Sequence, residues 1–156
     1  MGFAFIDQFR FADGAKAVAR MFVNLERCCD NDTYAVSVPE KYTCTLDVSI
    51  ADALRNPLTV CERTPLSWPG MKAVDNPTEM VKLSYCRMVL HYLEWLAAIE
   101  DLLMLNEKDR LTLTTSHLCP VVLLTMCFNT FKYNSDGFLL CNGFFYKKTE
   151  EENNDQ

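Results

Sequence analysis

The sequence predicts an all-α fold, an antiparallel helical sandwich with one small β-hairpin, and three observations support this prediction. Apolar residues recur at helical spacing over long stretches, and the longest stretch has two adjacent apolar rows. A charged run, Asn106 to Arg110, separates two of these stretches. Near the C-terminus, Asn142-Gly143 stands between two short apolar runs, which is the strongest short-range signal for a β-hairpin.

The first helix is expected at Ala15–Cys29, because Val18, Met21, Phe22 and Leu25 share one face.

Capping signals mark a second, shorter helix. Ser49 followed by Asp52 forms a capping-box-like pattern that opens it, and it ends before Pro57. The proline-punctuated segment that follows carries Trp68, so we expect this segment to pack on the core.

The longest expected helix starts at Asn76-Pro77, where the asparagine can cap the helix and the proline suits its first turn. Two adjacent apolar rows indicate that this helix packs between two layers. The first row is Val81, Tyr85, Met88, Tyr92, Leu96, Ile99 and Leu103, and the second is Cys86, Leu90, Leu93 and Ala97.

The charged run from Asn106 to Arg110 predicts a corner between two helices. Asn106 can cap a new helix that carries acidic residues in its first turn. We expect this helix at Glu107–Phe131, with a kink or a break at Pro120. From Leu118 onward it is apolar nearly all round, which is typical of a helix in the middle of a domain.

Composition excludes several classes of protein. A chain of 156 residues with a net charge of −6 has the size of one domain and no basic face for nucleic acid, so no direct DNA contact is expected. No signal peptide is recognised, and the best apolar run is shorter than the ~20 residues that span a bilayer, so no membrane is expected.

The eight cysteines include no Cys-x-x-Cys pair, so we expect no zinc site and interpret them as small apolar residues. Phosphate-binding loops, serine nucleophile elbows and His-Glu-x-x-His pairs are absent from the sequence. We therefore expect no enzyme, no metal and no cofactor.

The order of a long helix, a charged corner, an apolar helix and a hairpin resembles the ligand-binding domain of nuclear hormone receptors. "LEWLAAIEDLLML", Leu93 to Leu105, looks like the end of the family's third helix. Asp109-Arg110-x-x-Leu113 is similar to the opening of its fourth helix, and Asp136 to Leu140 with Gly143 looks like its hairpin. "ALRNPLTVCERTPLSW", Ala53 to Trp68, is similar to the connector in divergent nematode receptors.

The resemblance implies the N-terminal half of such a sandwich. The family's domain continues with several helices after the hairpin, and its zinc fingers need spaced cysteines. We therefore expect a partial domain that is truncated after the hairpin, lacks the DNA-binding domain and leaves the helix around Leu118–Phe128 partly uncovered. The expected organisation is an N-terminal extension over 1–14, the partial domain over 15–147 and a disordered acidic tail over 148–156.

The resemblance places eleven residues around a ligand cavity, which would be apolar with Ser84, Tyr85 and Asn129 as its polar groups. The alternative is that these residues simply fill a core. They are Val81, Ser84, Tyr85, Met88, Leu118, Val122, Leu123, Met126, Asn129, Leu140 and Cys141.

The resemblance also implies a groove for an amphipathic partner helix, with ordinary helix packing as the alternative. Ala97 stands where the family has a lysine that clamps the partner, so we expect no detectable binding of a Leu-x-x-Leu-Leu peptide. The groove residues are Leu90, Leu93, Ala97, Arg110, Leu111 and Thr115.

The functional hypothesis is a nuclear-receptor-like transcription regulator that binds a small lipophilic ligand, a coregulator helix or another receptor. Its expected location is the nucleus, with the cytoplasm as the alternative. Two alternatives stay open: a ligand-free helical interaction protein that pairs with a full-length receptor, and a non-functional gene fragment.

Overall fold

The computed structural model describes residues 12–30, 47–74 and 77–147, within which the side chains of 12, 13, 70, 71, 77, 79–81 and 83 are not described. The chain divides into two compact units, Met1–Asn31 and Asp32–Gln156. In the first unit, α1 spans Ala12–Cys29, close to the expected helix. The predicted cap at Asn76 and the predicted tail lie outside the described residues.

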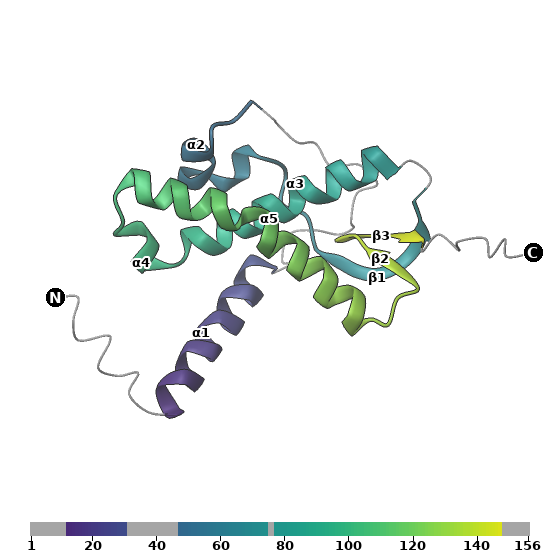
Figure 1. The fold of residues 1–156 in the computed structure, drawn as a ribbon, viewed down its shortest axis with the longest axis horizontal. Coiled ribbons are helices and arrows are strands. Elements are labelled where there is room, and N and C mark those ends of the chain that lie inside the picture. Colours follow the sequence, from purple (N-terminus) through teal and green to yellow (C-terminus); the bar gives the residue numbers. More distant parts are fainter. Residues whose placement is uncertain (1–11, 31–46, 75–76, 148–156) are drawn as a thin grey trace, which may run out of the picture. The chain divides into compact units, whose positions relative to one another are not determined.

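Two long helices organise the second unit. α3 (Pro77–Ala97) packs against α5 (Glu107–Lys132), and the short α2 (Ile50–Arg55) contacts both. A 3-10 turn, η2 (Pro57–Thr59), follows α2. Figure 1 shows the strands at the end of this unit where α3 begins and α5 finishes, with α2 and α4 (Glu100–Leu103) at the other end.

The capping predictions are confirmed at both described helix starts. The Ser49 hydroxyl accepts a hydrogen bond from the Asp52 amide at 3.1 Å, and the Asn106 side chain accepts one from the Asp109 amide at 2.9 Å. The corner between helices therefore exists. It is more complex than expected, because α3 ends at Ala97 and the chain forms the separate turn α4 before α5 begins.

α5 differs from its prediction in two respects. The helix is continuous through Pro120, so the predicted break does not occur. Proline removes only one backbone donor from a long helix, and the remaining bonds and the packing of α5 on α3 maintain it. The helix also does not lie in the middle of the unit, because Leu124, Phe128 and Phe131 are exposed, which agrees with the expectation that this helix is partly uncovered.

The predicted all-α fold with one small hairpin is wrong, because the hairpin belongs to a mixed sheet. Within the described residues the strand order is β1-β3-β2, and β1 (Ser67–Ala73) runs parallel to β3 (Asn142–Lys147). β1 contains Pro69, which is tolerated because β1 stands at an edge and its register shifts between Ser67 and Lys72.

The predicted hairpin itself is present, with its turn displaced. β2 (Gly137–Leu139) pairs antiparallel with β3, and Leu140 N donates to Phe144 O at 2.9 Å. Gly143 N donates to Leu140 O at 3.3 Å, and Gly143 has φ +80°. The loop is thus a three-residue turn that ends in a left-handed glycine, rather than a two-residue Asn-Gly turn.

The main core cluster lies between the sheet, α3 and α5. Ser84 of α3 fastens the hairpin to this core, because its hydroxyl accepts a hydrogen bond from the Cys141 amide at 3.1 Å. The buried apolar residues of the cluster are Trp68, Met88, Val122, Met126, Leu139, Leu140 and Cys141.

Candidate functional site

A groove of about 340 Å³ lies at the end of the second unit that is remote from the sheet. Four helices contribute to it, and five of its eight lining side chains are leucine or alanine. The groove brings together Ala97 and Arg110, two of the residues predicted for partner binding. Its lining residues are Leu54, Arg55, Leu96, Ala97, Leu102, Leu103, Arg110 and Thr114.

A second core cluster supports the groove from beneath. Its buried members Tyr92 and Leu93 come from α3, and Leu54 and Leu96, which line the groove, pack against it. The Tyr92 hydroxyl donates to the Thr114 carbonyl at 3.2 Å, which ties α3 to α5. Burial raises the pKa of Tyr92, so the phenol keeps its proton for this bond. The groove therefore has a fixed floor.

Two arginines give the groove its positive charge, and they differ in their polar contacts. Arg55 pairs with Asp52 at 2.7 Å and with Glu107 at 3.2 Å. All three side chains are largely exposed, so these ion pairs add little stability. The Arg110 Nε is buried and has no hydrogen-bond partner among the described residues. A buried donor without a partner is costly, so Arg110 is the group here that would gain most from an acceptor.

The other predicted groove residues do not line it. Leu90 is buried in a separate cluster with Cys61 and Cys86. Leu93 lies in the floor, Leu111 is half-buried, and Thr115 is exposed with its hydroxyl donating to the Leu111 carbonyl.

Sequence reasoning missed six of the lining residues. Leu54 and Arg55 come from α2, which no local pattern places against α3 and α5. Leu102 and Leu103 reach the groove because the chain turns at Ile99, which donates its amide to the Leu96 carbonyl at 3.1 Å. Leu96 and Thr114 also line the groove, but neither a leucine nor a threonine within a helix indicates a binding site from the sequence alone.

The residues predicted for a ligand cavity lie mostly in or beside the main core cluster. Met88, Val122, Met126, Leu140 and Cys141 are buried together there, and Tyr85 and Leu118 pack against them. Their role in ligand binding stays a prediction.

The remaining members of that set are spread out. The Ser84 hydroxyl accepts a hydrogen bond from the Cys141 amide, and the Asn129 side chain donates one to the Thr125 carbonyl of its own helix at 2.9 Å. Leu123 is exposed, and the side chain of Val81 lies outside the described residues.

Tyr85 forms the polar edge of the cluster. Its hydroxyl lies 3.2 Å from the Cys119 thiol. Burial, followed by the Cys119 contact, raises the pKa of Tyr85 to about 12, so this phenol is neutral at physiological pH. Within the described ranges, no group of three or more His, Cys, Asp or Glu side chains could hold a metal ion.

Glu94 is the carboxylate most affected by its surroundings. Its Oε1 lies 3.3 Å from Arg63, while its Oε2 is buried without a hydrogen-bond partner among the described residues. Burial raises the pKa of Glu94, and the opposing effects of Arg63, Arg87 and His91 are smaller.

We expect Glu94→Gln to stabilise the chain near neutral pH. Because the folded pKa is raised, the folded state binds the proton more tightly, and the free energy of unfolding falls as pH rises from 4.5 through the raised value. Glutamine removes that loss. Urea unfolding followed over pH should show the variant more stable above this window and the difference shrinking below it. If the variant were less stable than the parent at neutral pH, the ion pair between Glu94 and Arg63 would contribute more free energy than burial of the Glu94 charge costs.

Comparison with known proteins yields one informative similarity. The chain is 23% identical over 104 residues to nuclear hormone receptor family member nhr-100 of Caenorhabditis elegans, and the match covers 67% of this chain. It spans about a quarter, 24%, of that receptor's length. No family model matches the sequence, and no solved structure matches it. The similarity supports a relation between this chain and the nuclear hormone receptors.

Proposed function

We propose that the chain is a non-enzymatic, nuclear-receptor-like regulator of transcription in the nucleus, which binds an amphipathic helix of a coregulator or another receptor in the groove between α2, α3, α4 and α5. The observation that carries this proposal is an apolar groove with a buried arginine Nε that has no hydrogen-bond partner in the part of the chain that the structure describes. The similarity to a nematode receptor supports the functional class.

The apolar lining favours leucine side chains from one face of a helix. Such a helix presents residues at positions i, i+3 and i+4, and grooves of packed helices accept this spacing. Leu96 and Leu102 of the lining are half-buried, and Leu103 is exposed at the edge. Burial of leucines against these three residues would provide most of the binding free energy.

Arg110 determines which helix fits. The backbone carbonyls at the C-terminus of a neutral helix are weak acceptors, whereas a carboxylate forms a charge-assisted bond with a guanidinium. Ala97 offers no second cation on the α3 side. The preferred partner is therefore an apolar helix followed by acidic residues, and a neutral Leu-x-x-Leu-Leu helix remains a poor partner.

A small lipophilic ligand is our second proposal. It is supported by the apolar set around Met88, Val122 and Met126 together with the polar group Tyr85 at its edge. The side chains of this set pack directly against one another, which makes the groove the stronger candidate.

A pair of labelled peptides tests the groove. One carries Leu-x-x-Leu-Leu followed by two aspartates, and the other carries asparagines in their place. In fluorescence anisotropy titrations the acidic peptide should bind at least about tenfold more tightly, because hydrogen bonds to charged groups contribute about 1.5–3 kcal/mol. Arg110→Gln should remove this preference. Equal binding of both peptides to the parent chain, or binding of neither, would contradict the proposal.

A matched pair of variants localises the binding. Leu103 lines the groove and Met104 does not, although both side chains are exposed at the end of α4. Leu103→Asp should abolish binding of the acidic peptide, whereas Met104→Asp should leave it nearly unchanged. Since both variants place the same charge on exposed neighbours, a difference in folding is not expected.

A further inference from the structure

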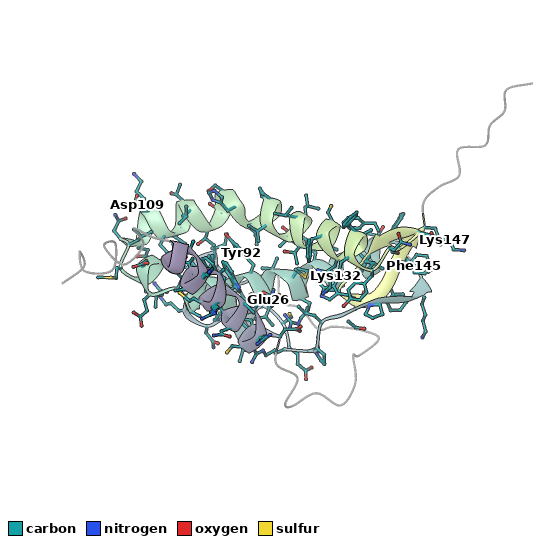
Figure 2. All side chains as sticks on the ribbon, turned by 90° about the horizontal axis from the view of Figure 1, so that it is seen from below. Glu26, Tyr92, Asp109, Lys132, Phe145 and Lys147 are labelled. Atoms are coloured by element: carbon teal, nitrogen blue, oxygen red, sulfur yellow. The ribbon has the colours of Figure 1, made fainter. Side chains whose placement is uncertain are left out.

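One of the two groove arginines already binds a carboxylate of this chain. Arg55 of α2 lines the groove, and its Nη2 donates a hydrogen bond to Oε1 of Glu107 at 3.2 Å. Glu107 occupies the first turn of α5 and is not one of the lining residues. Figure 2 shows Asp109, from the same turn, at the end of α5 that lies away from Phe145 and the sheet. A side chain of α5 therefore binds a cation that the opposite wall, α2, contributes to the groove.

The second groove arginine lies one turn further along α5. Arg110 follows Glu107 by three residues, so their side chains are neighbours on the surface of the helix. The buried Nε of Arg110 has no hydrogen-bond partner among the described residues, whereas the Nη2 of Arg55 has one in Glu107. Glu107 thus lies beside both arginines. A partner carboxylate that binds next to Arg110 can therefore bind Arg55 as well only if it displaces Glu107.

The ion pair between Arg55 and Glu107 is suited to an exchange of partners. The two side chains are 61% and 58% exposed, and ion pairs between exposed side chains are weak. Arg55 keeps a second partner when Glu107 leaves, because its Nη1 binds Asp52 of its own helix at 2.7 Å. Asp52 is itself fixed by the Ser49 hydroxyl, which donates to its other oxygen at 2.6 Å. Another carboxylate can therefore take the place of Glu107 at Nη2 while Arg55 stays fixed to α2.

The local charges show what Glu107 does to an acidic partner. Asp52 and Glu107 together cancel the charges of Arg55 and Arg110. The two other charged residues in the first turn of α5 have opposite signs and cancel each other. While Glu107 is present, an acidic partner therefore meets no net positive charge at this end of the groove. Without the charge of Glu107, the same end carries one net positive charge.

We propose that Glu107 is an internal competitor for the acidic residues of the partner helix, and that Arg55 is the second groove residue that binds them. This inference rests on the proposed function, since it concerns the same groove and the same class of partner. Arg110 has its Nε buried, so it pairs with the acidic residue that directly follows the apolar helix. The next acidic residue displaces Glu107 from Arg55. In the parent chain this second acidic residue adds little affinity, because one exposed ion pair replaces another.

Three labelled peptides test the competition in fluorescence anisotropy titrations of the full chain. Each carries Leu-x-x-Leu-Leu, followed by Asp-Asp, Asp-Asn or Asn-Asn. The parent should bind the Asp-Asp and Asp-Asn peptides about equally, and the Asn-Asn peptide at least about tenfold more weakly. Glu107→Gln should bind the Asp-Asp peptide about two- to fivefold more tightly than the Asp-Asn peptide, because the second aspartate now gains an ion pair without displacing another.

Two further variants show whether the gain comes from Arg55. Glu100→Gln is the matched control, since Glu100 is an exposed carboxylate in the first turn of α4, which is another wall of the groove. It removes the same charge, but no ion pair of Glu100 with a groove arginine is present among the described residues. Its affinities for the Asp-Asp and Asp-Asn peptides should stay about equal. Combining Glu107→Gln with Arg55→Gln should make these two affinities equal again.

The outcomes separate this inference from the proposed function. A parent chain that binds the Asp-Asn and Asn-Asn peptides equally contradicts the proposed function. A parent that prefers the Asp-Asn peptide, together with a Glu107→Gln variant that gains nothing from the second aspartate, overturns only the competition. The competition is also overturned if Glu100→Gln gains as much as Glu107→Gln, because the effect then follows net charge rather than Arg55. If neither the parent nor Glu107→Gln binds any of the peptides, both are overturned.

Discussion

Gly137→Ala is expected to destabilise the second unit by about 3 kcal/mol, at the upper end of overpacking penalties. Gly137 is buried in β2 directly against β3. A β-carbon here would overlap the Tyr146 carbonyl oxygen and would also meet the Phe145 ring. Because the obstacle is backbone, the strands must separate to make room. Because the hairpin contributes Leu139, Leu140 and Cys141 to the main core cluster, separating its strands should also weaken the packing of these residues on α5.

Urea unfolding monitored by tryptophan fluorescence, to which Trp68 in the core and Trp95 both contribute, would measure this change, with Gly143→Ala as the control. A β-carbon on Gly143 has ordinary contacts, the nearest at 3.4 Å from the Ser67 hydroxyl oxygen. Its φ of +80° still disfavours alanine, at a cost of about 1–2 kcal/mol. If the Gly137→Ala variant were no less stable than Gly143→Ala, the claim that β2 packs too closely on β3 to admit a β-carbon at Gly137 would be wrong.

Arg87→Ala is expected to lower the free energy of unfolding by about 2–5 kcal/mol, the range for removing a large buried side chain. Arg87 is only 1% exposed, and its Nε donates to the Thr64 carbonyl at 2.7 Å. This bond fastens the chain before β1 to the middle of α3. Alanine would leave a cavity and a carbonyl without its partner.

Arg87→Met separates the packing of this side chain from its charge. The Arg87 Nη1 is buried and has no hydrogen-bond partner among the described residues, so the cation is incompletely solvated. Replacing buried charges by apolar side chains of similar size is often neutral. We therefore expect methionine to cost clearly less than alanine in the same urea titration. Equal losses for both variants would show that the bond to Thr64, rather than the filling of space, holds this segment.

Features encoded locally could be predicted from the sequence. The caps at Ser49 and Asn106 depend on residues three positions apart, and both form as expected. The hairpin was predicted from a glycine and its apolar neighbours, and only its turn was displaced, because Gly143 takes the left-handed position at the end of a longer loop. Such features need no knowledge of the rest of the fold.

Features that depend on distant segments could not be predicted. β1 pairs with β3 across more than half of the described chain, and Pro69 and Gly70 within it oppose a strand assignment on local grounds. The resemblance placed Leu123 around a cavity, whereas its side chain is exposed, and the apolar pattern of α5 alone does not show which face of the helix is covered. Ala97 and Arg110 were predicted for a partner groove, but α2 supplies the other wall of the observed groove from a segment more than forty residues away.

The proposal that the groove is the partner-binding surface has one most direct measurement, a titration of the ¹⁵N-labelled chain with the acidic peptide followed by amide correlation spectra. The proposal predicts that the resonances of Leu96, Ala97, Leu103 and Arg110 move, while those of Met88 and Val122 stay in place. Changes concentrated at Met88, Val122 and Leu140 instead would place binding in the main core cluster and would contradict the account.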